Sequence, residues 1–167
     1  MKKILYLALI VPFMIMWYSC DSNSNDTIVY IVRHAEKDLV DTTDNPPLIQ
    51  AGIDRSKALV KEMNAIEIDG VFSTYYDRNL NTVSPLAKER GLFITNYEWY
   101  GYQSMLDDIK NNSGKVYLIC GHGDNILPMI EYLGGERPME FLEKQEYDKL
   151  FKVIISEKEV KVEVNTY

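Results

Sequence analysis

The chain contains two histidines, His34 and His122, and each follows one of the two most hydrophobic strands that the sequence predicts. Residues 28–32 (IVYIV) and 115–120 (KVYLIC) are rich in β-branched and aromatic residues, which predicts strands buried on both faces of a parallel sheet. The carboxyl ends of parallel strands meet at one edge of the sheet, where open α/β folds bind ligands. Each histidine alone could be a polar cap on a strand, but the matching contexts favour two imidazoles that converge on one site.

Two arginines are expected at the same edge. Arg33 directly precedes His34, and Arg78 follows the short strand predicted at 71–74, near the start of the next helix. Guanidinium groups match the oxygens of phosphate, and the free N–H groups of a helix N-terminus add partial positive charge. Arg78 alone could instead form an ion pair on the surface of its helix. In a chain with a net charge of -7, this concentration of cations and imidazoles predicts a locally basic pocket that holds phosphate.

The same residues resemble known motifs. RHAE at 33–36 is similar to the RHG or RHA signature of the histidine phosphatase superfamily, which has the phosphoglycerate mutase-like fold. GH at 121–122 resembles its second histidine motif, and RNLNT at 78–82, followed by SPLA at 84–87, resembles its R-x-x-[QN]-T segment and the helix after it. The resemblance runs in order from residue 27 to about residue 133.

The resemblance implies a role for each residue of the motifs. His34 would be the nucleophile and would form a phosphohistidine, which divides one difficult displacement into two easier ones. Arg33, Arg78 and His122 would hold the phosphoryl oxygens as negative charge shifts during transfer. The resemblance implies no cofactor and no metal ion, and two histidines without a matched carboxylate cluster make a poor zinc site.

Three carboxylates are candidates for the general acid that protonates the leaving group. Glu98 is ranked first, because it resembles the glutamate that follows the third strand in the phosphoglycerate mutase-like branch. Asp124 is second, one position later than the aspartate that follows the second histidine in the acid phosphatase branch. Glu36 is third, because it adjoins the nucleophile but could also be solvated or paired with Lys37. Asp124 and Glu36 are also candidates for substrate binding.

Strands and helices that could position these residues alternate along the chain. The sequence predicts strands at 28–32, 71–74, 92–95 and 115–120 and helices at about 50–64, 77–90, 102–111 and 125–133. Pro85 predicts a kink or restart in the second helix. Residues 152–155 and 160–164 flank Glu157 and Lys158 and predict an antiparallel hairpin at one edge of the sheet. The order predicts an α/β fold, a three-layer α/β/α sandwich with a mostly parallel central sheet.

The loops between the predicted elements are brief, which predicts a shallow and open pocket. An open pocket favours hydrolysis over mutase transfer, because a mutase must shield its phosphoenzyme from water. It admits small phosphorylated molecules, a phosphorylated protein side chain or the end of a glycan. Aromatic residues could surround its rim or pack in the core, namely Tyr75, Tyr76, Trp99, Tyr100 and Tyr102. The alternatives are a non-catalytic binding module for phosphorylated ligands and a phosphomutase. The acidic net charge argues against a nucleic-acid partner.

The N-terminal segment has the pattern of an export signal. Two lysines precede an apolar run at 4–18, which predicts a signal peptide over residues 1–20. Ser19-Cys20 resembles the end of a bacterial lipobox, in which the cysteine is lipidated, although Trp17 stands where a smaller aliphatic residue is usual. A plain secretory signal and an uncleaved anchor are the alternatives.

The expected product is a lipoprotein of the bacterial cell envelope, anchored in the membrane through Cys20. Residues 21–26 (DSNSND) are small and polar, which predicts a flexible tether. The resemblance implies that residues 27–167 form a single histidine phosphatase-like domain. This domain contains one cysteine, Cys120, so no internal disulfide can form, and folding must depend on the hydrophobic core.

Overall fold

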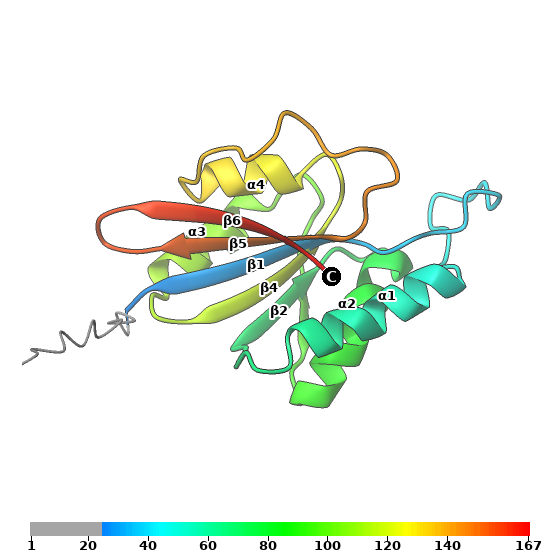
Figure 1. Cartoon of the computed structure of the whole chain (residues 1–167), viewed down its shortest axis with the longest axis horizontal. Helices are drawn as coiled ribbons and strands as arrows, with labels where there is room; N and C mark the ends of the chain where they lie inside the picture. Colours follow the sequence, from blue (N-terminus) through cyan, green and yellow to red (C-terminus); the bar gives the residue numbers. More distant parts are fainter. Residues whose placement is uncertain (1–24) are drawn as a thin grey trace, which may run out of the picture.

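The computed structural model describes residues 25–167. The predicted signal peptide, Cys20 and most of the predicted tether therefore lie outside the described residues. Helices and strands alternate from the first strand onward and end in a hairpin (Figure 1). The elements are β1 (Thr27–Arg33), α1 (Gln50–Glu62), β2 (Gly70–Ser73), α2 (Asp77–Arg90), β3 (Ile94–Asn96), α3 (Gln103–Asn111), β4 (Val116–Gly121), α4 (Ile126–Tyr132), β5 (Lys149–Ile155) and β6 (Val160–Thr166).

The strands form one six-stranded sheet with the order β3-β2-β4-β1-β5-β6. β3, β2, β4 and β1 are parallel to their neighbours, whereas β5 and β6 continue the sheet in antiparallel pairing. The mostly parallel sheet and its antiparallel C-terminal hairpin are as predicted. β1 and β4 lie side by side in the centre, and Arg33 pairs with Gly121 at their carboxyl ends.

The two faces of the sheet bury alternate residues, because successive side chains of a strand point to opposite sides. α1 and α2 cover the face that carries Tyr30, Val32 and Leu118, and α3 and α4 cover the face that carries Ile31 and Ile119 (Figure 1). Two hydrophobic clusters result, one on each face. The predicted three-layer α/β/α sandwich is therefore confirmed.

Some boundaries differ from the prediction. β5 begins at Lys149 rather than at residue 152, because it pairs with β6 over its whole length and with β1 from Leu150 onward, which buries Leu150 and Phe151. α2 runs without interruption through Pro85 to Arg90. Packing of Leu86 and Ala87 in the core holds the last turns of α2, although proline removes one hydrogen bond.

Nothing between residues 25 and 167 is a candidate for a membrane-spanning helix: the helices described there are too short or too polar.

Candidate active site

The two histidines lie side by side at the centre of the sheet edge. His34 directly follows β1 and His122 directly follows β4, and the His34 N–H donates to the Gly121 carbonyl at 3.1 Å. The centroids of the two imidazole rings are 5.5 Å apart. Only 4% of His34 and 2% of His122 is exposed to solvent. The pairing of β1 with β4 therefore sets the separation of the rings.

The backbone fixes the tautomer of His34. Its Nδ1 lies 2.9 Å from the Ala35 carbonyl oxygen. A carbonyl oxygen only accepts hydrogen bonds, so Nδ1 carries the proton in this contact and Nε2 keeps its lone pair. Nε2 has no hydrogen-bond partner among residues 25–167. A neutral imidazole with a free Nε2 can act as a nucleophile.

Burial keeps both imidazoles uncharged. Desolvation lowers the pKa of His34 to about 3, assisted by the positive charges of Arg33 and Arg78, although the hydrogen bond to Ala35 raises it. Desolvation also lowers the pKa of His122 to about 2, with further contributions from His34 and Arg78. Both rings are therefore neutral near pH 7 in the absence of a bound anion.

In both Arg33 and Arg78, one nitrogen of the guanidinium is hydrogen-bonded to a backbone carbonyl, and the Nε atom has no partner among the described residues. Arg33 Nη1 donates to the Glu143 carbonyl at 2.9 Å, and Arg78 Nη1 donates to the Asp44 carbonyl at 3.2 Å. The Nε atoms of both arginines are buried and lack a hydrogen-bond partner among the described residues. Because arginine stays protonated, these Nε–H groups are available donors for an anion.

The first turns of α2 connect the two histidine segments. Asn79 donates from Nδ2 to the Gly121 carbonyl at 2.9 Å. The Thr82 hydroxyl accepts the Ala35 N–H at 2.9 Å and donates to the Arg78 carbonyl at 2.7 Å. The one hydroxyl therefore links the loop after His34 to the turn that carries Arg78.

His122 is held on several sides. Its Nε2 is hydrogen-bonded to the Thr74 hydroxyl at 3.0 Å, and its ring stacks on Trp99 with centroids 3.8 Å apart. Tyr76 meets the ring edge-on at 5.4 Å. The His122 N–H donates to Asn125 Oδ1 at 2.8 Å. No hydrogen bond engages His122 Nδ1 among the described residues, so this nitrogen is free to contact a ligand.

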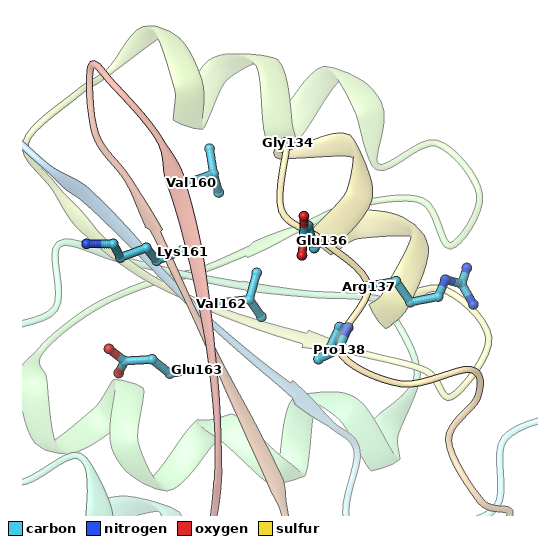
Figure 2. Close-up of a pocket in the computed structure, with 8 residues that line it drawn as sticks. All are labelled: Gly134, Glu136, Arg137, Pro138, Val160, Lys161, Val162 and Glu163. Carbon is cyan, nitrogen blue, oxygen red and sulfur yellow. The ribbon is translucent and has the colours of Figure 1, made fainter.

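A pocket of about 380 Å³ is lined by the two arginines and two histidines that were expected to bind phosphate, Arg33, His34, Arg78 and His122. It carries four cationic side chains and a single carboxylate, so it is strongly basic in an acidic protein. The lining residues are Arg33, His34, Lys37, Arg78, Trp99, His122, Gly123, Asp124, Leu142 and Lys144. A larger hollow, of about 570 Å³, lies elsewhere, between β6 and the loop after α4, and contains none of these residues (Figure 2). The smaller pocket, which holds both histidines, is therefore the candidate active site.

The structure does not bring the first-ranked acid to this pocket. Glu98 is exposed and does not line the pocket, and its neighbour Trp99 lines it instead. Glu36, the third-ranked acid, also lies outside the pocket lining and forms an ion pair with Arg55 at 2.6 Å, so it has a structural partner. Neither carboxylate lines the pocket in this structure, so a catalytic role for either one stays a prediction.

Asp124 is the carboxylate that does line the pocket. Its Oδ1 accepts a hydrogen bond from Trp99 Nε1 at 3.0 Å, and its Oδ2 accepts one from the Tyr100 hydroxyl at 3.4 Å. These contacts hold an exposed side chain in one orientation at the mouth of the pocket.

Sequence reasoning missed several residues of the pocket. Lys37 follows the first motif, but Glu36 beside it suggested a solvated pair, so no signal singled it out. Leu142 and Lys144 come from the segment between α4 and β5, which has no regular periodicity. Among the predicted rim aromatics, Trp99 lines the pocket and Tyr102 packs against the core.

Within the described part of the chain, no group of three or more histidine, cysteine, aspartate or glutamate side chains is placed to hold a metal ion.

The profile of the histidine phosphatase superfamily (branch 1) matches residues 29–98. Over these residues the chain is similar to the histidine phosphatase superfamily. The matched segment includes Arg33, His34 and Arg78 and ends before His122. No curated protein matches the sequence.

Similar solved structures share the phosphoglycerate mutase-like fold. The protein histidine phosphatase SixA, solved with tungstate, is 21% identical with a TM-score of 0.65, over 83% of this chain and 96% of that chain. A phosphoserine phosphatase from Entamoeba histolytica, solved with 3-phosphoglyceric acid, is 16% identical with a TM-score of 0.66, over 84% and 98%. A phosphoglycerate mutase from Bacillus anthracis is 14% identical with a TM-score of 0.64, over 85% and 93%.

Proposed function

We propose that this protein is a phosphatase that hydrolyses phosphomonoesters through a phosphohistidine formed on His34 without a metal ion. The observation that carries the proposal is the orientation of His34. The carbonyl of Ala35 engages Nδ1, so the unprotonated Nε2 is left free in a pocket that is also lined by Arg33 and Arg78, whose Nε–H groups lack a partner among the described residues. A nucleophile and a binding site for its electrophile therefore coincide.

The reaction has two steps. His34 Nε2 attacks phosphorus, the new N–P bond forms, and the bond to the ester oxygen breaks as that oxygen takes a proton. A water molecule then attacks phosphorus, the N–P bond breaks, and inorganic phosphate leaves. Arg33, Arg78 and His122 hold the non-bridging oxygens in both steps, because preorganised donors stabilise the charge that develops there.

We propose Asp124 as the acid of the first step and the base of the second. It is the carboxylate in the pocket lining, and Trp99 and Tyr100 orient it. A leaving group with a low pKa departs without this proton, so the role of Asp124 depends on the substrate.

Substrates of the proposed phosphatase are small phosphomonoesters or phosphorylated protein side chains. The similar structures support both classes, since one is named a protein histidine phosphatase and another a phosphoserine phosphatase. Lys144 and Asp124 are exposed at the pocket mouth, which suits a substrate that protrudes. Hydrolysis is favoured over mutase transfer, because an open mouth admits water to the phosphohistidine.

The proposal extends to the location of the enzyme. Residues 1–20 would direct export, Cys20 would carry the lipid anchor in the bacterial envelope, and residues 27–167 would be the catalytic domain. Mass spectrometry of protein extracted from membranes tests this. Acyl chains on an N-terminal Cys20 are expected, and an unmodified N-terminus elsewhere would contradict the anchor.

The experiment that tests the activity measures phosphate release from an aryl phosphate in the presence of a metal chelator. The unaltered chain should turn over, and His34→Ala should lose at least about 1,000-fold in rate. Phosphate binding by His34→Ala, followed by calorimetry, controls for an intact pocket. Equal rates for both proteins would exclude His34 as the nucleophile. Phosphate binding without turnover of any phosphomonoester by the unaltered chain would favour the non-catalytic binding module.

A further inference from the structure

Strand β6 forms an open edge of the sheet. It is the last strand in the order and pairs only with β5 (Figure 1). Every residue from Val160 to Thr166 is exposed or half-buried. An edge strand with free backbone groups is a template for pairing with another strand.

The hydrogen bonds of the hairpin reveal which backbone groups of β6 are free. Ser156 N–H donates to the Glu159 carbonyl and Tyr167 N–H donates to the Asp148 carbonyl, so these two pairs are hydrogen-bonded pairs. In antiparallel strands, hydrogen-bonded and non-hydrogen-bonded pairs alternate. The register of β5 with β6 then directs the N–H and C=O groups of Lys161 and Glu163 toward β5. The N–H and C=O groups of Val160, Val162 and Val164 point away from β5, in the plane of the sheet, and so lie along its free edge.

The side chains of β6 alternate between valine and charge. Val160 and Val162 point toward the loop after α4, and Lys161 and Glu163 point to the opposite face (Figure 2). When two copies of the sequence V-K-V-E-V at 160–164 run antiparallel with Val162 opposite Val162, valine faces valine and the charged residues are complementary. In this arrangement the lysine of each copy faces the glutamate of the other.

We propose that β6 pairs antiparallel with β6 of a second copy of this chain, with Val162 opposite the partner's Val162. This register joins the outward backbone groups of Val160, Val162 and Val164 to those of the partner. It places Lys161 opposite the partner's Glu163 in a non-hydrogen-bonded pair, in which side chains lie closest. The two sheets become one continuous sheet across a two-fold axis.

The charges of Lys161 and Glu163 favour this register over the two antiparallel registers that are shifted along the strand. A two-fold axis through residue 161 would place Lys161 opposite the partner's Lys161, and an axis through residue 163 would place two glutamates opposite each other. Like charges that face each other across strands are destabilising. A lysine in an edge strand normally opposes pairing, but here the partner's Glu163 satisfies it.

Ion pairs already present would continue across the interface. Glu163 forms an ion pair with Lys152 at 3.0 Å, and Lys161 forms one with Glu159 at 2.8 Å. Pairing in the proposed register joins them into one row of alternating charges that spans both hairpins. Networks of this kind contribute more than isolated surface pairs.

The hollow of about 570 Å³ lies on the valine side of the same strand, bordered by Gly134 and Pro138 (Figure 2). Residues directly opposite each other in an antiparallel pair point to the same face of the sheet. The partner's valines would therefore continue the apolar row of Val160 and Val162 beside this hollow.

The test is sedimentation equilibrium of the full chain in mild detergent, with charge reversals that leave the candidate active site untouched. The unaltered chain should dimerise, and Lys161→Glu and Glu163→Lys should each weaken the dimer by about tenfold or more. A mixture of the two variants should form heterodimers, because each carboxylate of the first variant then faces a lysine of the second. The double variant K161E/E163K should regain the homodimer.

Val162→Pro gives a second test, since it removes an outward N–H that no strand of the same chain uses. It should abolish the dimer with an unchanged circular dichroism spectrum. Arg137→Gln, an exposed change on the far side of the hollow, is the matched control and should leave the dimer intact. A monomeric unaltered chain at high micromolar concentration, or a dimer that survives both charge reversals unchanged, would overturn the proposal.

Discussion

The indole of Trp99 lies flat on the imidazole of His122, with ring planes 12° apart and centroids separated by 3.8 Å. Trp99 also donates from Nε1 to Asp124 at 3.0 Å. One side chain thus touches both the second histidine and the carboxylate of the pocket.

Substitutions of Trp99 should separate these two contacts. Trp99→Phe keeps a stacking ring and loses the hydrogen bond, so a fall in kcat of about threefold is expected. Trp99→Leu loses both and should reduce kcat by about tenfold, since aromatic pairs contribute about 1 kcal/mol. Steady-state kinetics on an aryl phosphate measures the difference. Tyr75→Leu, an exposed aromatic outside the pocket lining, should have no effect. A larger loss in Trp99→Phe than in Trp99→Leu would contradict the stacking role.

Leaving-group dependence should identify the general acid. Asp124→Asn is expected to slow hydrolysis of an alkyl phosphate by about 100-fold, because a poor leaving group needs the proton. Hydrolysis of a nitrophenyl phosphate should change much less. Glu98→Gln is the matched control and should behave as the unaltered protein, because Glu98 lies outside the pocket lining. A slow Glu98→Gln variant with a normal Asp124→Asn variant would reverse the assignment.

Thr82 should act through the groups that it joins. Thr82→Val leaves the Ala35 N–H without its acceptor, so we expect a loss of about 1 to 3 kcal/mol in the free energy of unfolding. Activity should also fall, because the backbone beside His34 loses its link to Arg78. Thr82→Ser keeps the hydroxyl and should restore most of both quantities. Urea denaturation and kinetics provide the measurements, and equal behaviour of the valine and serine variants would refute the link.

The histidines predict how stability depends on pH. Their folded pKa values of about 3 and about 2 lie below the usual value of 6.5. The unfolded chain therefore binds protons below pH 6.5 that the folded chain does not, so stability is present above that pH and falls as pH decreases. Between pH 6.5 and 5 each histidine should contribute a loss of about 2 kcal/mol.

Urea denaturation in phosphate-free buffer at pH 7 and pH 5 checks this dependence. His34→Gln should show a smaller loss than the unaltered chain. Since the chain has two histidines, imidazole NMR signals can be followed directly, and both rings should remain neutral at pH 5. A ring that titrates near pH 6.5 would contradict the expectation.

Anion binding should stabilise the fold through the basic pocket. Phosphate at about 100 times its Kd adds about 2.7 kcal/mol, which corresponds to a rise in Tm of roughly 5 to 10 °C. Chloride at equal ionic strength should add little. Arg78→Gln should lose the phosphate effect, whereas Arg137→Gln, whose partner is Glu131, should keep it. Scanning calorimetry distinguishes these outcomes.

The sheet and the meeting of the two histidines could be predicted because both depend on local patterns. The buried strands that end at Arg33 and Gly121 are continuous apolar runs, and parallel pairing brings their ends together. The sequence also predicts that the C-terminal hairpin lies at one edge of the sheet, where β5 and β6 are found.

The ranking of the candidate carboxylates could not be predicted, because the position of Glu98 depends on a short irregular turn. Tyr97 is buried and donates its hydroxyl hydrogen to the Cys120 carbonyl, and Trp99 faces the pocket. Glu98 between them is therefore turned outward to solvent. The presence of Lys144 in the pocket could not be predicted either, because its segment is positioned by a long-range hydrogen bond from Arg33 to the Glu143 carbonyl.

The pairing of Arg33 with Gly121 also determines how the site should fail on heating. The histidines are attached to the two central strands. We expect the hydrogen bonds of these strands to open only when the whole domain opens, because core strands are the most protected part of a fold. Fraying of the outer hairpin or of the surface loops leaves the spacing of the imidazoles unchanged. Heat inactivation and global melting should therefore share a single midpoint, so residual activity would serve as a direct reporter of the folded fraction.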